Sequence, residues 1–240
     1  MSSPADFYNS LPPVSKSFGT LCVLTTLGYQ LGVMKAEWLL LDFALVASKF
    51  QIWRLLTNFI FLGPFSMQFG VRILMIAKYG VQLEKGPFDK RTADFVWMFI
   101  VSMVALLAMA LALPTIRFYV GHALVFMLLY VWSREFANAR VSLMGLVTLQ
   151  GFWLPWALLA VNTMFGHPFL VDLLGIVVGH IYYFLTVLHP QATGHNYLKT
   201  PRWVHQLVAQ WPRPQAPSTQ TTVSPGARTA FSGRSYRLNQ

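Results

Sequence analysis

The chain has 240 residues, of which 55% are hydrophobic and only 11% are charged, and its formal net charge is +10. Soluble domains usually carry about 25% charged residues, so this composition excludes an ordinary soluble domain. Strongly basic proteins are often nucleic-acid binders, but here the basic residues do not form one dense patch. They separate long apolar stretches, which indicates membrane topology and gives no support to nucleic acid as a partner.

Six stretches are apolar enough to be membrane-spanning helices, which need about 20 mostly apolar residues. They cover residues 17–34, 55–77, 95–113, 118–133, 142–161 and 169–188. Pro114 ends the third stretch, and Gly166-His167-Pro168 separates the fifth from the sixth. Pro155 lies inside the fifth, where we expect it to kink the helix or to mark where neighbouring groups satisfy the freed carbonyl. The expected fold class is therefore an all-α membrane protein with a bundle of six transmembrane helices.

The basic residues predict the orientation of this bundle. With six spans, thirteen of the 18 basic residues lie on the side that holds both termini and four lie on the other, with Arg72 near a helix end. The positive-inside rule then places both termini in the cytosol. We expect a membrane domain over residues 1–190, an amphipathic cytosolic helix within 191–211 that Thr200 caps, and a basic disordered tail over 212–240, rich in Pro, Gln, Ser and Thr.

The loop between the first two stretches, residues 35–54, is too apolar for a solvated loop and too charged to span. Helices lying in the membrane interface are the first expectation, and a luminal cap packed on the bundle is the alternative. The loop ends in Trp53-Arg54, an interfacial indole beside a cation that can bind carbonyl groups or lipid headgroups. These two residues are the predicted contacts with the membrane interface and a gate.

The sixth stretch holds the candidate intramembrane site. Asp172 is a carboxylate near its start, which makes it a functional candidate, although a helix N-terminus alone could also stabilise it. Gly175 and Gly179 form a GxxxG pattern that predicts close helix packing, and His180 is expected to hydrogen-bond or pack rather than bind a ligand. Without a His-Glu-x-x-His motif, we predict no metal site, no cofactor and no catalytic residue.

The combination of six spans, a bulky first loop and GxxxG in the last span is similar to the rhomboid superfamily. Five segments resemble the derlins within it: 51–59 (QIWRLLTNF), 91–95 (RTADF), 130–134 (YVWSR), 152–156 (FWLPW) and 171–180 (VDLLGIVVGH). The resemblance covers residues 7–201. It implies a rhomboid-like fold in the endoplasmic reticulum (ER) membrane.

The resemblance also implies a protein without protease activity. Active rhomboid proteases carry a serine in a Gly-x-Ser-Gly motif of the fourth span and a histidine three residues before the first GxxxG glycine. Here residues 116–132 contain no serine, and Asp172 stands in the place of the histidine. An intramembrane serine protease is therefore a disfavoured alternative. A small-solute transporter is disfavoured as well, because the chain shows no internal repeat and one carboxylate at membrane depth.

As a derlin-like pseudoprotease, the chain is expected to assist retrotranslocation of misfolded proteins to the cytosol in ER-associated degradation. Derlins recruit a hexameric AAA ATPase through a C-terminal motif, roughly Phe-x-Gly-x-Gly-x-x-Leu. The tail offers Phe231, Gly233, Arg237 and Leu238 in this order, with Ser235 where the second glycine is expected. The other implied partners are a ubiquitin ligase complex, the misfolded substrates, membrane lipids, and further chains in a homo- or hetero-oligomer.

Overall fold

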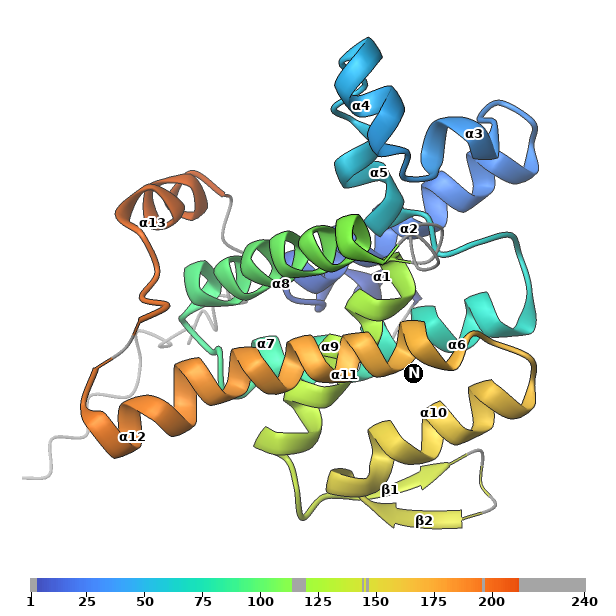
Figure 1. Cartoon of the computed structure of the whole chain (residues 1–240). Coiled ribbons are helices and arrows are strands. Elements are labelled where there is room, and N and C mark those ends of the chain that lie inside the picture. The colour runs from blue at the N-terminus through green and yellow to red at the C-terminus, as the bar shows by residue number, and fades with distance from the viewer. Residues whose placement is uncertain (1–3, 114–119, 144, 146, 196, 212–240) are drawn as a thin grey trace, which may run out of the picture.

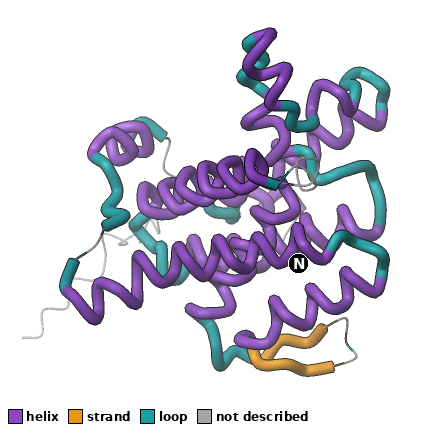
Figure 2. The backbone as a smooth tube through the Cα atoms, in the orientation of Figure 1, coloured by secondary structure: helices purple, strands orange, loops and turns teal. Residues whose placement is uncertain are grey.

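The computed structural model describes residues 4–113, 120–143, 145, 147–195 and 197–211. These residues form a mostly helical bundle, and their strands are confined to one hairpin (Figures 1 and 2). Helix α9 (Val120–Glu135) packs against both α8 (Thr92–Ala112) and α11 (Phe169–Tyr183). The predicted fourth span corresponds to α9, although its first two residues lie outside the described part of the chain.

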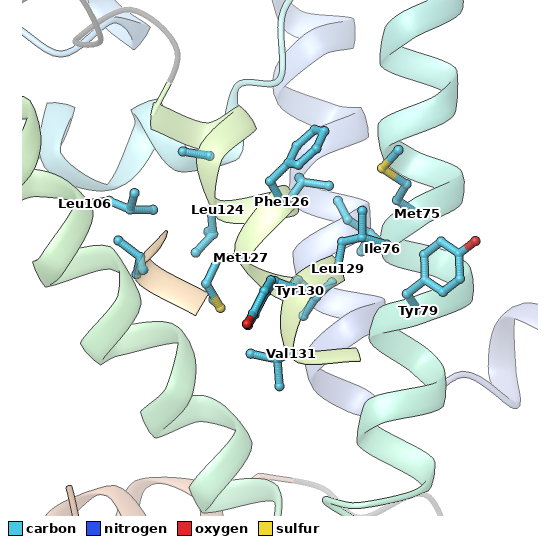
Figure 3. Packing of buried hydrophobic residues seen from close by; sticks show 14 of the residues in the cluster. Met75, Ile76, Tyr79, Leu106, Leu124, Phe126, Met127, Leu129, Tyr130 and Val131 are labelled. Atoms are coloured by element: carbon cyan, nitrogen blue, oxygen red, sulfur yellow. The ribbon is translucent and has the colours of Figure 1, made fainter. Parts of the chain in front are cut away.

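Helix α9 forms the centre of the core. Every side chain from Val120 to Ser133 is buried, and nearly all of them are apolar, as expected for a helix that other helices surround. Figure 3 shows its side chains filling the space between Leu106 of α8 and Met75, Ile76 and Tyr79 of the neighbouring helix. The apolar composition that predicts membrane spans therefore also provides the packing of the bundle.

The first predicted span is a helix, α2 (Pro13–Gln30), which follows the short α1 (Pro4–Asn9). It begins at a proline, which suits the first turn, and ends just before Gly32, whose φ is +73°. The predicted interfacial loop contains two short helices, α3 (Ala36–Leu39) and α4 (Phe43–Lys49). Their position relative to the membrane stays a prediction.

The second predicted span, residues 55–77, is wrong as a single helix. It consists of α5 (Arg54–Ile60), a non-helical segment over residues 61–66, and α6 (Met67–Met75). Gly63 has a φ of +96° and Pro64 follows it, so the chain leaves the helical conformation there. Ser66 caps the new helix by accepting a hydrogen bond from the Phe69 N–H at 3.1 Å. This helix continues through the π-helical η1 (Ile76–Gly80) and α7 (Val81–Lys85).

The fifth predicted span, residues 142–161, is also wrong over its first half. Strands β1 (Arg140–Leu143) and β2 (Val147–Gln150) form an antiparallel hairpin there, so the fold is not purely α-helical. Gly145 adopts a φ of +77° between the strands, and short hairpin loops commonly place a glycine in this left-handed conformation. A 3₁₀ turn, η3 (Gly151–Trp153), leads into α10 (Leu154–Met164). Pro155 occupies the first turn of α10, where a proline is accommodated. The expected kink at Pro155 is therefore wrong.

The sixth predicted span continues from α11 through η4 (Phe184–Leu188) and α12 (His189–Thr193) as one helix of 25 residues. Within the described ranges, this helix and α8 are the two that are long and apolar enough to cross a membrane, so six spans stay a prediction. The amphipathic α13 (Arg202–Ala209) starts after Pro201. Thr200 does not cap α13 as predicted, because its hydroxyl donates to Asp94 at 2.5 Å.

Candidate functional site

A cation lies inside the bundle at the second turn of α6. Arg72 is 7% exposed, although it was expected near a helix end. Its Nη1 donates to the Leu62 carbonyl oxygen at 3.2 Å, and its Nη2 lies 3.4 Å from both ring nitrogens of His167. The segment that interrupts the predicted second span thus supplies the carbonyl that the guanidinium needs, because residue 62 lies outside any helix.

Two histidines adjoin this guanidinium. His122, on the first turn of α9, is buried, and its Nε2 lies 3.2 Å from the Leu62 carbonyl oxygen. The His122 and His167 rings are perpendicular, with 6.3 Å between their centroids. Burial first, and then the charge of Arg72, lower the pKa of His167, which lies in the loop between α10 and α11. A neutral His167 can accept a hydrogen bond from Arg72.

Asp172 lies in the first turn of α11 and is 4% exposed. Its Oδ2 accepts a hydrogen bond of 2.9 Å from Nδ2 of Asn162, a residue of α10, and Arg72 attracts it electrostatically. Asn162 and Arg72 therefore stabilise Asp172 in addition to the N-terminus of α11. We call Arg72, His122, Asn162, His167 and Asp172 the polar cluster.

The polar cluster borders a cavity of about 450 Å³ between α6 and α10. Apolar side chains make up most of its wall, and Arg72 and Asn162 are its members from the polar cluster; the other lining residues include Met67, Val71, Leu158 and Phe165. Met67 and Phe165 are 80% and 69% exposed, so the cavity opens toward the outside of the bundle. We call this cavity the groove. A mostly apolar wall with a few buried polar groups is the usual construction of a ligand site.

The remaining predicted residues lie apart from the groove. Trp53 is 53% exposed, whereas Arg54 is buried and holds the first loop together. Its Nε donates to Oε1 of Gln51 at 2.6 Å, and its Nη1 donates to the carbonyl oxygens of Glu37 and, at 2.9 Å, Leu40. Arg54 thus binds carbonyl groups of its own loop.

Gly175 and Gly179 face α9. A Cβ atom on Gly175 would lie 2.7 Å from Cβ of Phe126, and one on Gly179 would lie 2.9 Å from Cβ of Tyr130. His180 is exposed, and its Nδ1 forms a 2.7 Å hydrogen bond with the Tyr130 hydroxyl. The structure does not bring these residues into the polar cluster. The predicted tail residues Phe231, Gly233, Arg237 and Leu238 lie outside the described residues.

Of the polar cluster, the sequence predicted a functional role for Asp172 alone. Arg72 carried a recognisable signal, because a lone cation within an apolar stretch is costly unless it has partners. The sequence contains no such signal for His122, Asn162 and His167. Their role depends on contacts with residues in other parts of the chain.

Comparisons with known proteins agree with the derlin-like motifs. A model of the Der1-like family matches residues 11–202. The chain is 53% identical to Derlin-1 of Arabidopsis thaliana, with 99% of each chain covered, and 55% identical to Derlin-1 of Oryza sativa subsp. japonica, with 100% of each covered. It is 36% identical to a probable derlin-2 homolog of Dictyostelium discoideum over 85% of this chain and 82% of that one. The chain therefore belongs to the Der1-like family, the derlins, which are rhomboid-like membrane proteins of ER-associated degradation.

Proposed function

We propose that this protein is a non-catalytic component of ER-associated degradation that helps misfolded proteins return from the ER lumen and membrane to the cytosol. Its derlin relatives support a role in this pathway. The observation that carries the mechanism is the polar cluster beside a groove that opens on the side of the bundle.

The groove offers a polypeptide a less costly path than lipid does. A hydrocarbon core is about 30 Å thick, and each unsatisfied backbone group in it costs several kcal/mol. Arg72 supplies N–H donors and Asn162 supplies both a donor and an acceptor at the groove wall. A segment seated there would find hydrogen-bond partners that lipid lacks.

A short helix, α10, supports a second contribution, local thinning of the bilayer. Its 11 residues rise about 16 Å, which is less than the thickness of the hydrocarbon core. Hydrophobic mismatch of this kind thins the surrounding lipid. Bilayer thickness around the reconstituted protein should therefore be smaller than in bulk lipid, and equal thickness would remove this contribution.

The proposed role requires no hydrolysis. Residues 116–132 contain no serine, so α9 offers no nucleophile at the level of the GxxxG glycines. Ser133, one residue later, is buried and donates to the Tyr130 carbonyl oxygen at 2.7 Å. Asp172 accepts from Asn162 and has no nucleophile to activate.

A photo-crosslinking experiment tests the groove directly. A photoreactive residue replaces Met67 or Phe165 at the groove, or Val104 as a control, which is 62% exposed on α8. A misfolded substrate undergoing degradation should crosslink from the two groove positions and not from Val104. Equal crosslinking from all three positions, or none from the groove, would place the substrate path elsewhere.

The tail is the proposed ATPase-binding element. With both termini in the cytosol, Phe231, Gly233, Arg237 and Leu238 would recruit the AAA ATPase, while a ubiquitin ligase complex and further derlin chains are the other partners that family membership suggests. Deleting residues 229–240 should abolish co-purification of the ATPase, whereas deleting residues 214–225 shortens the tail equally and should not. Retained binding after the first deletion would move the contact to another part of the chain.

A further inference from the structure

A second cavity, of about 600 Å³, lies at the opposite end of α11 from Asp172. It is enclosed by the start of α8, the end of α9, the junction of α11 with η4, and the segment that leads into α13. Its charged and aromatic lining residues include Arg91, Asp94, Glu135, Tyr182, Lys199 and His205. None of these residues belongs to the polar cluster, and the proposed function does not use this cavity.

The outer wall of the cavity is a segment that side-chain contacts hold against α8. Residues 197–203, which we call the strap, cross the start of α8 on their way to α13. Trp97 Nε1 donates to the Leu198 carbonyl oxygen at 3.0 Å, and the Thr200 hydroxyl donates to Oδ1 of Asp94 at 2.5 Å. The Trp97 and Trp203 rings meet edge to face, with centroids 6.1 Å apart. These contacts hold the strap in place over the cavity.

The lining carries charges of both signs. Asp94 is occupied, because its Oδ2 pairs with Nε of Arg91 at 2.7 Å while its Oδ1 binds Thr200. Among the residues that the structure describes, neither Lys199 nor Glu135 takes part in an ion pair within 4.0 Å, although Arg91 attracts Glu135 electrostatically. Both side chains are exposed at the cavity, so one ammonium group and one carboxylate can meet a ligand there.

With the two candidate spans in a bilayer, the cavity lies at the level of the lipid headgroups. It adjoins the first turn of α8 and the last part of the helix that runs from α11 to α12, the two helices long and apolar enough to span. The neighbouring α13 exposes Trp203 and Leu207, about half of each side chain, as interfacial helices do. A bilayer lipid could reach this cavity without leaving the membrane.

We propose that this cavity binds the headgroup of a zwitterionic phospholipid, either phosphoethanolamine or phosphocholine, with the strap as its outer wall. Lys199 and Arg91 suit the phosphate, since both are strong donors to anionic oxygens. Glu135 and the faces of the tyrosine rings suit the ammonium group, the rings through cation–π attraction. A purely anionic headgroup fits less well, because Asp94 and Glu135 repel it.

Native mass spectrometry of the delipidated full-length protein tests this site. Phosphatidylcholine, phosphatidylethanolamine and phosphatidylglycerol with identical acyl chains are titrated separately, together with soluble glycerophosphocholine. Glu135→Gln and Lys199→Gln each remove one charge of the cavity, and Asp89→Asn and Lys78→Gln remove like charges from exposed residues outside it. Melting curves of all four variants establish that each is folded.

Both zwitterionic lipids should bind more tightly than phosphatidylglycerol, and each cavity variant should weaken that binding about tenfold, the loss of one charge-assisted contact. The two control variants should bind as the wild type does. Preferred binding of phosphatidylglycerol, or unchanged binding by the cavity variants, would overturn the proposal. Glycerophosphocholine binding as tightly as the lipid would also overturn it, by making the occupant a soluble phosphodiester. Substrate crosslinking at the groove is independent of all these outcomes.

Discussion

The close contact between α9 and α11 depends on a glycine, and replacing it with alanine should loosen the core. A Cβ atom on Gly175 would lie 2.7 Å from Cβ of Phe126 and closer still to the carbonyl oxygen of Ala123. A backbone carbonyl within a helix cannot turn aside as a flexible side chain can, so the two helices must separate. Overpacking of this kind costs about 1–3 kcal/mol, and we expect Gly175→Ala at the upper end of that range.

Gly70→Ala is the matched control, because Gly70 is also a helical glycine and a Cβ there meets no heavy atom within 4 Å. Alanine in a helix is more favourable than glycine by about 0.5–1 kcal/mol, so this variant should be as stable as the wild type or slightly more stable. The single cysteine, Cys22, is buried and provides the assay. A thiol-reactive fluorophore labels it when the bundle unfolds on heating.

For a chain of this size, 1 kcal/mol shifts the melting temperature by about 2–4 °C. Gly175→Ala should therefore lower the labelling midpoint by about 6–12 °C relative to the wild type. Gly179→Ala should have a smaller effect, because the nearest atom to its Cβ, at 2.9 Å, belongs to the Tyr130 side chain. Equal midpoints for Gly175→Ala and Gly70→Ala would refute the close contact.

Three further outcomes are expected. Glu84 accepts hydrogen bonds from the Val14 N–H at 2.9 Å and from the N–H and hydroxyl of Ser15 at 2.8 and 2.7 Å, so Glu84→Ala should destabilise the protein by about 1–3 kcal/mol in the same thermal assay. Burial raises the pKa of the Glu84 carboxyl, so its contribution is full below the unfolded pKa of about 4.3 and is lost as pH rises through the folded value. The wild type should therefore lose stability relative to Glu84→Gln as the pH rises above about 4, and a constant difference would contradict this sign. Asn162→Leu leaves buried Asp172 without its amide donor and should cost about 1–3 kcal/mol, which unchanged melting would disprove.

Elements that depend on composition were predictable from the sequence. The helices α8 and α11 follow from long, mostly apolar stretches. The family follows from five local motifs, and the comparisons confirm it. The hairpin over residues 140–150 was missed because this segment is also apolar and lacks acidic residues, so it reads as part of a span. The break at Gly63-Pro64 was missed for the same reason, although both residues are strong helix breakers.

The polar cluster could not be predicted, because its contacts join residues far apart in the chain. Arg72 and His167 are 95 positions apart, and His122 is 60 positions from the carbonyl of Leu62 that it contacts. No local sequence pattern predicts contacts between residues so far apart in the chain. It arises when α6, α9 and the loop before α11 pack together, and the break before α6 leaves the Leu62 carbonyl free to accept.

The half-life of a misfolded luminal protein tests the central claim most directly. It is measured in cells that lack their own derlins and are supplied with the wild type, Arg72→Leu, or Lys78→Leu as an exposed-cation control, all at equal levels. Wild type and Lys78→Leu should shorten the half-life, and Arg72→Leu should do so less, because the groove loses its buried donor. A half-life that is the same with and without the wild-type protein would contradict the proposed role.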